Sequence, residues 1–194
     1  MNDSKNVTTA KPKVGGAASY APVGTKVPAD ATSVLDAAFK GLGYISEDGV
    51  VNSNSFDSNN IKAWGGDIVD ASESGKTDTF QFTLIESLLP DVRKAVFNDE
   101  NVSGDLASGM TTRFNSKEHK HHAWVFDEVL KDDALQRIVI PDGKVTAVGD
   151  ITHSDGTLLG YQITVLAFPS DAIDGDTHRE YTVRAAASTG TEGK

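Results

Sequence analysis

The residues best suited to metal chemistry form one short histidine cluster, Glu118-His119-Lys120-His121-His122. On an extended strand His119 and His121 would share a face, and two imidazole nitrogens are suitable zinc ligands. However, Lys120 stands between them, and no third ligand follows at the spacing of a zinc site. We therefore interpret His119, His121 and His122 as a weak metal candidate, and we expect a solvated turn at the end of a polar hairpin.

A second group of potential ligands is the acidic run at residues 171–176, which reads Asp-Ala-Ile-Asp-Gly-Asp. Its three carboxylates lie near a glycine, but a calcium loop needs a longer ladder of oxygen ligands and a closing glutamate. The run therefore predicts a turn before the last strand.

Motifs of catalysis are missing from the sequence. The glycines at Gly41, Gly43, Gly65 and Gly66 lack the strand–glycine–helix context of a phosphate-binding loop. The chain has no Gly-x-Ser-x-Gly, no His-Glu-x-x-His and no Ser/His/Asp spacing that points to a triad. Scattered carboxylates could still supply the acidic pair of a hydrolase, as in any acidic protein. We expect no catalytic residues, no enzyme activity and no cofactor.

Composition limits the possible partners. The chain has 194 residues and no cysteine, so it needs no disulfide to hold a core and has no thiolate ligand. The formal net charge is −10, from 28 acidic and 18 basic residues. Such a protein is poorly suited to gripping phosphates, but it suits a surface that nucleic acid must pass without sticking. No apolar run approaches the ~20 residues of a membrane helix, and no secretory signal opens the chain, so we expect a soluble protein without membrane contact.

The chain divides into a body and two arms. Residues 1–33 are rich in Lys, Thr, Gly, Ala, Pro and Ser and show little periodicity, so we expect an extended N-terminal arm that orders on a partner. Residues 34–184 form the β-domain. Residues 185–194 are a low-complexity run of Ala, Ser, Thr and Gly, which predicts a flexible C-terminal tail.

Strands dominate the body. In residues 78–85, Phe80, Phe82 and Leu84 fall on one face while Thr79, Gln81 and Thr83 fall on the other. This period of two places one face on a core and the other on solvent or a lumen. A strand is also expected at residues 158–168, and its residues alternate in the same way from Tyr161 onward. Further strands are expected at residues 55–64, 110–115, 122–131, 136–140, 144–151 and 180–184.

Glycine-containing signals predict the turns between these strands. Pro141-Asp142-Gly143 and Ser154-Asp155-Gly156 are typical of tight hairpin turns, which predicts an antiparallel meander over residues 136–168. Ser46-Glu47-Asp48-Gly49 predicts a further turn, and Gly65-Gly66 ends the strand of residues 55–64.

One helix is expected, over residues 87–97. Ser87 is the candidate N-cap and Pro90 lies in the first turn, where proline is tolerated. Leu88 or Leu89 would share an apolar face with Val92 and Val96, which predicts packing on the sheet. The fold class is therefore mainly β: an antiparallel β-sandwich or partly closed barrel with one short flanking α-helix.

Several segments, in this order and spacing, make residues 35–184 similar to a known family. The segments are Ile61-Lys62-Ala63-Trp64-Gly65-Gly66-Asp67-Ile68-Val69, Asp78-Thr79-Phe80-Gln81-Phe82-Thr83-Leu84-Ile85-Glu86, Ile140-Pro141-Asp142-Gly143-Lys144-Val145 with Val148-Gly149-Asp150-Ile151, and Tyr161-Gln162-Ile163-Thr164-Val165-Leu166-Ala167-Phe168-Pro169. The chain resembles the major tail protein, or tail tube subunit, of long-tailed (siphovirus-type) bacteriophages of Gram-positive or actinobacterial hosts.

The resemblance implies a structural virion protein. Tail tube subunits form hexameric rings that stack into the tube through which DNA leaves the capsid, and they share their fold with type VI secretion tube proteins. The implied partners are further copies of the chain, a tape-measure protein and the baseplate and tail terminator proteins, with DNA passing through the lumen without specific binding. The implied location is the virion tail, after assembly in the host cytoplasm.

Two other hypotheses remain open. A β-sandwich module that binds a cell-surface carbohydrate would be a stable monomer with an exposed aromatic platform, for which Trp64, Trp124 and a few tyrosines are available. The third hypothesis is the carboxylate hydrolase. Size in solution separates them, because only the tail tube requires assembly into rings.

Overall fold

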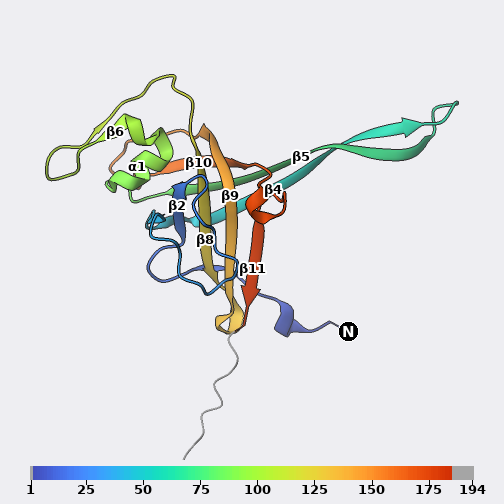
Figure 1. The fold of residues 1–194 in the computed structure, drawn as a ribbon, viewed down its shortest axis with the longest axis horizontal. Coiled ribbons are helices and arrows are strands. Elements are labelled where there is room, and N and C mark those ends of the chain that lie inside the picture. The colour runs from blue at the N-terminus through green and yellow to red at the C-terminus, as the bar shows by residue number, and fades with distance from the viewer. Residues whose placement is uncertain (1, 185–194) are drawn as a thin grey trace, which may run out of the picture.

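The folded elements are almost entirely antiparallel strands (Figure 1). The computed structural model describes residues 2–184, so the tail expected at residues 185–194 lies outside the described residues. The strands are β1 (Lys11–Pro12), β2 (Ala18–Pro22), β3 (Lys40–Gly41), β4 (Ile45–Lys62), β5 (Ile68–Leu84), β6 (Val102–Ser103), β7 (Thr111–Thr112), β8 (His121–Val129), β9 (Leu135–Val148), β10 (Tyr161–Ala167) and β11 (Arg179–Val183). One α-helix, α1 (Pro90–Phe97), and four short 3-10 turns, η1 (Ser4–Asn6), η2 (Asp99–Asn101), η3 (Lys131–Asp133) and η4 (Asp171–Ile173), complete the described chain.

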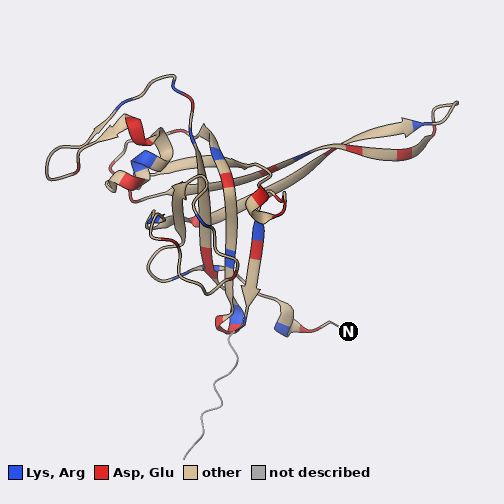
Figure 2. Cartoon of the chain, viewed as in Figure 1, with Lys and Arg blue, Asp and Glu red and all other residues tan. Residues whose placement is uncertain are grey.

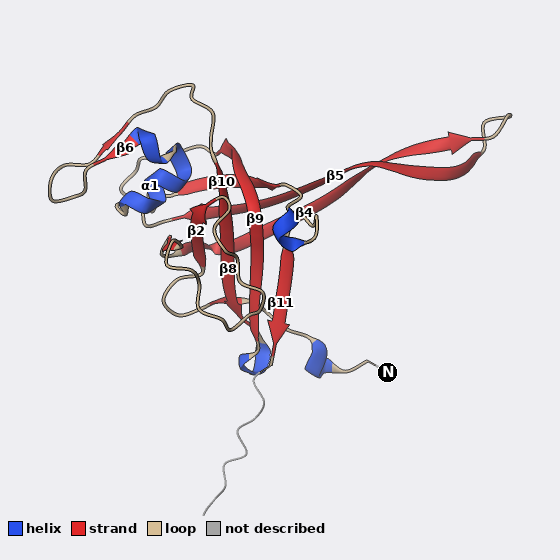
Figure 3. Ribbon diagram, in the orientation of Figure 1, coloured by secondary structure: helices blue, strands red, loops and turns tan. Residues whose placement is uncertain are grey.

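Nine strands form one sheet, in the order β3-β2-β8-β9-β10-β5-β4, with β1 added to β8 and β11 added to β9. Strands β6 and β7 form a separate small ribbon beside α1 (Figure 3). The end strands β3 and β4 do not pair with each other, so the sheet is not closed into a barrel. The predicted mainly β fold class is confirmed.

The core lies where the sheet folds over on itself. Phe82 on β5 meets Phe126 on β8 edge to face, with 5.0 Å between ring centroids, and Phe80 stacks on Phe126 at 6.1 Å. Strands β9 and β10 separate β5 from β8 in the sheet order, so these rings face each other across the interior, as in a sandwich. The buried side chains of β10, which are Tyr161, Ile163, Val165 and Ala167, fill the same core as the alternation predicts.

The helix covers one end of this core. Val92, Ala95 and Val96 are buried, and Leu89 packs against the core while Leu88 is exposed. The helix begins at Pro90, and Leu89 occupies the N-cap position without a side-chain hydrogen bond. The prediction of Ser87 as N-cap was therefore wrong, because the chain becomes helical only at Pro90, whose fixed φ suits the first turn.

The predicted hairpin at Pro141-Asp142-Gly143 was also wrong. Strand β9 runs through these residues, and Gly143 pairs with His122 on one side and with Ala167 on the other. A Cβ at Gly143 would lie 2.8 Å from Trp124 and from Val165, so the glycine permits close packing between strands. Pro141 and Asp142 lie at a register shift against β8, where an unpaired residue is tolerated.

The predicted turn at Ser46–Gly49 is likewise a bulge within one strand. The pairing of β4 with β5 shifts from Ile45 opposite Leu84 to Val50 opposite Phe82, and Gly49 has φ 71°. The structure also corrects the N-terminal arm, because Ala18–Pro22 forms β2 between β8 and β3 with Tyr20 buried. This part of residues 1–33 belongs to the sheet, since its short run of alanines and one tyrosine packs against β8.

Candidate functional site

The most prominent feature of the surface is a long two-stranded arm. Strands β4 and β5 leave the sandwich together and continue far beyond it (Figure 1). Every residue from 53 to 77 is exposed, and we call this segment the arm. Its tip is a short loop in which the Ala63 N–H donates to the Asp67 carbonyl at 2.8 Å. Gly65 and Gly66 have φ values of 130° and 100°, which only glycine adopts readily.

The arm exposes apolar side chains as well as backbone edges. Trp64 at the tip is fully exposed, and Phe56, Ile61, Ile68 and Val69 are about half exposed or more. A two-stranded hairpin is marginally stable alone in water, and unpaired strand edges attract other chains. Apart from Lys76, whose ammonium group donates to Thr177 at 3.3 Å, the arm is an exposed element, and its apolar side chains lie outside the hydrophobic core of residues 2–184.

A buried polar cluster fixes the root of the arm to the body. The Asp78 carboxylate on β5 is fully buried and accepts hydrogen bonds from Asn52 on β4 at 2.8 Å and from Thr177 at 2.5 Å. His178 Nδ1 lies 2.5 Å from the same carboxylate, and its ring also contacts Phe80. Burial alone would raise the pKa of Asp78, but the hydrogen bonds from His178, Thr177 and Asn52 outweigh it and lower the pKa to about 2.

A pocket of about 290 Å³ lies beside α1, and we call it the Tyr20 pocket. Its apolar walls come from Tyr20, Ala21, Pro22, Ala38 and Val102, and its polar groups from Lys40, Lys94, Asp99 and His122. The Tyr20 hydroxyl donates to Asp99 at 3.4 Å, and His122 Nε2 lies 3.8 Å from the same carboxylate. These long contacts leave the Asp99 carboxylate with room to accept a shorter hydrogen bond.

Burial shapes the protonation of the two aromatic groups in this pocket. It raises the pKa of the Tyr20 hydroxyl, and the nearby Asp99 carboxylate adds to the effect. Burial lowers the pKa of His122, although Asp99 opposes the shift. Both groups are therefore neutral near pH 7. The fixed charges at the pocket are those of Lys40, Lys94 and Asp99, and both lysines also pair with Asp91, at 3.3 Å and 3.7 Å.

The structure separates the three predicted candidate histidines. His119 precedes β8 and is not on a strand, so it does not share a strand face with His121. His121 points to Asp142, with 2.5 Å between Nδ1 and Oδ1, and its ring lies tilted against that of Phe168, with 4.8 Å between the ring centroids. His122 points inward against Tyr20. Within residues 2–184 no group of three or more His, Asp or Glu residues could hold a metal ion.

The acidic run at residues 171–176 is a turn before β11, as predicted, and part of its charge is paired. Asp174 and Asp176 both accept hydrogen bonds from the Arg179 guanidinium at 2.7 Å, which raises the pKa of that arginine further. The run begins as the 3-10 turn η4, and Asp174 ends it with φ 58°. Two of its aspartates therefore hold Arg179, the first residue of β11, in place.

Acidic and basic residues are interspersed along the ribbon of the described residues (Figure 2). The arm carries Asp57, Asp67, Asp70 and Glu73 against Lys62 and Lys76, so it is acidic. No helix among the described residues is long and apolar enough to span a membrane.

In comparisons with known proteins, no protein-family model and no curated protein sequence matches the chain. The candidate functional surface therefore rests on geometry alone, and it consists of the arm, its tip and the Tyr20 pocket. The arm was not predicted from the sequence, which indicated only a strand of about ten residues at 55–64. A detectable signal existed, since the polar runs on both sides of Trp64-Gly65-Gly66 lack the alternating apolar residues of a core strand.

Proposed function

We propose that the protein is a structural subunit that assembles into stacked hexameric rings, the tail tube of a long-tailed bacteriophage, through which DNA is ejected into the host. The observation that carries the proposal is the arm, a long exposed ribbon that leaves the body and has apolar side chains at and near its tip. Such an element can bind neighbouring subunits in an assembly. On a monomer its exposed strand edges and apolar side chains would instead favour aggregation.

Two further features support assembly. The sheet ends at β3 and β4, and pairing such ends with neighbouring copies would remove open edges. The net charge of −10 suits a conduit for DNA, because like charges repel and the nucleic acid does not adhere. In this proposal tape-measure, terminator and baseplate proteins are further partners, and the protein resides in the virion tail after assembly in the host cytoplasm.

One observation favours the second candidate function, a module that binds a cell-surface carbohydrate. Trp64 is fully exposed, as a sugar-stacking platform would be. However, it stands at the end of a thin ribbon beside two glycines, with no neighbouring aromatic at the tip to form a broad platform. A ligand screen against bacterial surface glycans tests this alternative.

The decisive experiment is negative-stain electron microscopy of the tag-free protein, with light scattering on the same sample. Hollow rings or tubes with a central channel are expected. The matched control is a variant in which residues 56–76 are replaced by an Asn-Gly turn, which keeps the Asn52–Asp78 contact and removes the arm. This variant should remain folded and monomeric. A wild-type protein that stays monomeric at every concentration, and binds a glycan, would contradict the proposal.

A further inference from the structure

Four aspartates of the chain are followed directly by glycine, a dipeptide that can rearrange its own backbone without an enzyme. The pairs are Asp48-Gly49, Asp142-Gly143, Asp155-Gly156 and Asp174-Gly175. Because glycine has no side chain to shield its nitrogen, that nitrogen can reach the carboxyl carbon of the preceding aspartate. The fold holds the four pairs differently, so their rates of rearrangement should differ.

The rearrangement passes through a cyclic imide, the succinimide. The glycine nitrogen forms a bond to Cγ of the aspartate and loses its proton, while the carboxyl oxygen that leaves Cγ departs as water. Water then opens the ring at either carbonyl, which restores aspartate or leaves isoaspartate, whose backbone runs through the side-chain carbon. No electrons are exchanged, and water is the only co-reactant. The ring closes only where the aspartate can rotate freely toward the glycine nitrogen.

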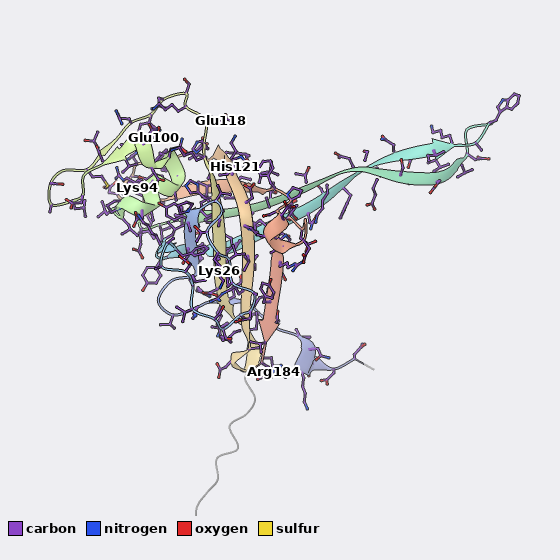
Figure 4. All side chains as sticks on the ribbon, in the orientation of Figure 1. Lys26, Lys94, Glu100, Glu118, His121 and Arg184 are labelled. Atoms are coloured by element: carbon purple, nitrogen blue, oxygen red, sulfur yellow. The ribbon has the colours of Figure 1, made fainter. Side chains whose placement is uncertain are left out.

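The pair Asp142-Gly143 is held inside the sheet. The Asp142 carboxylate lies 2.5 Å from Nδ1 of His121, which is labelled near the top of the sheet in Figure 4. The carbonyl of Asp142 accepts a hydrogen bond from the Phe168 N–H at 2.8 Å, and Gly143 pairs with residues of both β8 and β10. Ring closure here would first break the pairing of β9.

The pair Asp174-Gly175 is held by hydrogen bonds to both reacting groups. The Asp174 carboxylate accepts from the Arg179 guanidinium at 2.7 Å. The Gly175 N–H, which would supply the attacking nitrogen, donates to the Ser170 carbonyl at 2.9 Å. Both contacts must be lost before the nitrogen can reach Cγ.

The pair Asp48-Gly49 is restrained less strongly. It lies in the bulge of β4, between Ile45 and Val50, which both pair with β5. Gly49 has φ 71°, and the Ser46 hydroxyl donates to the exposed Asp48 carboxylate at 3.3 Å. The flanking pairs limit rotation of the backbone, so this pair should react at an intermediate rate.

The pair Asp155-Gly156 lies in the exposed loop between β9 and β10. Within residues 2–184 the Gly156 N–H donates no backbone hydrogen bond. The hydroxyls of Ser154 and Thr157 are hydrogen-bonded to each other, so the pair stands at the tip of a turn. A Cβ at Gly156 would meet no heavy atom within 4 Å, so the glycine is surrounded by open space. Exposed loops of this kind also move more than paired strands.

We propose that Asp155 is a site of spontaneous isomerisation to isoaspartate, and that it reacts fastest of the four Asp-Gly pairs in the folded protein. The product has a backbone longer by one methylene between Asp155 and Gly156. The same loop lines a depression of about 810 Å³ against Thr83 and Gln162, so isomerisation changes the shape of this depression while the strands keep their pairing. The reaction needs no second copy of the chain, so it does not depend on the proposed tail tube.

Mass spectrometry of aged protein tests this ranking. Dilute protein is kept for weeks at neutral pH in water enriched in heavy oxygen, which enters an aspartate each time its succinimide is hydrolysed. Fragmentation by electron transfer then distinguishes isoaspartate from aspartate at each position. We expect several-fold more isoaspartate and label at Asp155 than at Asp142 or Asp174, with an intermediate amount at Asp48. Equal amounts at the four positions, or more at Asp142, would overturn the proposal.

Unfolded protein provides the control for the intrinsic chemistry. In concentrated guanidinium chloride the native contacts of all four pairs are lost, so the label should become similar at the four positions. A preference for Asp155 that persists unchanged in the denaturant would assign it to the neighbouring sequence, and would overturn selection by the fold.

Gly156→Val is the matched variant. The branched side chain shields the attacking nitrogen, and the open space around this residue admits it without a clash. Isoaspartate at Asp155 should fall several-fold, while the amounts at the other three pairs stay as in the wild type. Thermal unfolding checks that the variant is folded. An unchanged amount at Asp155 in the folded variant would mean that the nitrogen of residue 156 is not the nucleophile, which contradicts the proposal.

Discussion

Strands β4 and β5 each run through two regions, the body and the arm, which differ in how far their side chains are buried. Near the body β5 buries Phe80, Phe82 and Leu84 in the core, whereas residues 53–77 are exposed on both faces. The hydrogen-bonded pairing of the two strands continues through both regions. The boundary lies at Asp78, whose buried carboxylate joins β4, β5 and the segment before β11.

This contrast shows that backbone pairing and core packing are separate requirements. Hydrogen bonds between β4 and β5 hold the ribbon together along its whole length. Only the part of the ribbon that lies in the body also gains free energy from the burial of apolar side chains. The apolar residues of the arm lie outside the core, so they gain little of that free energy within residues 2–184. In the proposed function the body provides stability and the arm provides a surface for assembly.

The sharpest test of the contrast is a pair of identical substitutions on the same ribbon. Phe82→Ala should lower the free energy of unfolding by about 3–5 kcal/mol, because the ring is buried against Trp124 and Phe126. Phe56→Ala on the arm should change it by less than about 0.5 kcal/mol. Urea denaturation of dilute, unassembled protein measures both. Equal losses would mean that the arm folds back on the body.

The polar cluster at the boundary should make stability depend on pH in the acid range. The pKa of Asp78 is lowered from an unfolded value of 3.8 to about 2, so the carboxylate stabilises the folded state above pH ~4. This contribution, about 2 kcal/mol, is lost as the pH falls from ~4 toward 2. The difference in the free energy of unfolding between the wild type and Asp78→Asn should therefore shrink as the pH falls from ~4 toward 2.

Denaturation at a series of pH values measures this effect. The control is Asp57→Asn, which removes an exposed carboxylate of the arm and should leave the stability close to that of the wild type at neutral pH. A constant difference between the wild type and Asp78→Asn from pH 6 to pH 2 would contradict the assignment of the lowered pKa to Asp78.

The sequence was sufficient to predict those elements whose conformation depends on their own side chains. The alternation in residues 78–85 and 161–168 predicted the core faces of β5 and β10, since burial on one face follows from period two. Gly65-Gly66 correctly ended the first strand of the arm. These signals are local, and no distant segment competes with them.

Prediction failed where distant partners decide the conformation. Pro141-Asp142-Gly143 has the composition of a turn, yet β8 and β10 on either side hold it extended. Ala18–Pro22 has too little periodicity to predict a strand, and it becomes one by pairing with β8. Of the candidate site, Trp64, Gly65 and Gly66 at the tip were named beforehand, and His122 only as a weak metal candidate. The Tyr20 pocket itself was not predicted, because it joins segments far apart in the chain.

The last comparison concerns the glycines of the two regions. Gly143→Ala should destabilise the protein by about 1–3 kcal/mol, since the new methyl group would lie 2.8 Å from Trp124 and Val165 within a packed core. Gly75→Ala on the arm meets only the Asp57 carboxylate at 3.3 Å, at the end of a side chain that can move into solvent. It should cost less than about 0.5 kcal/mol. Thermal unfolding of the two variants compares them, and a larger loss for Gly75→Ala would show that the arm, and not the core, limits the stability of the fold.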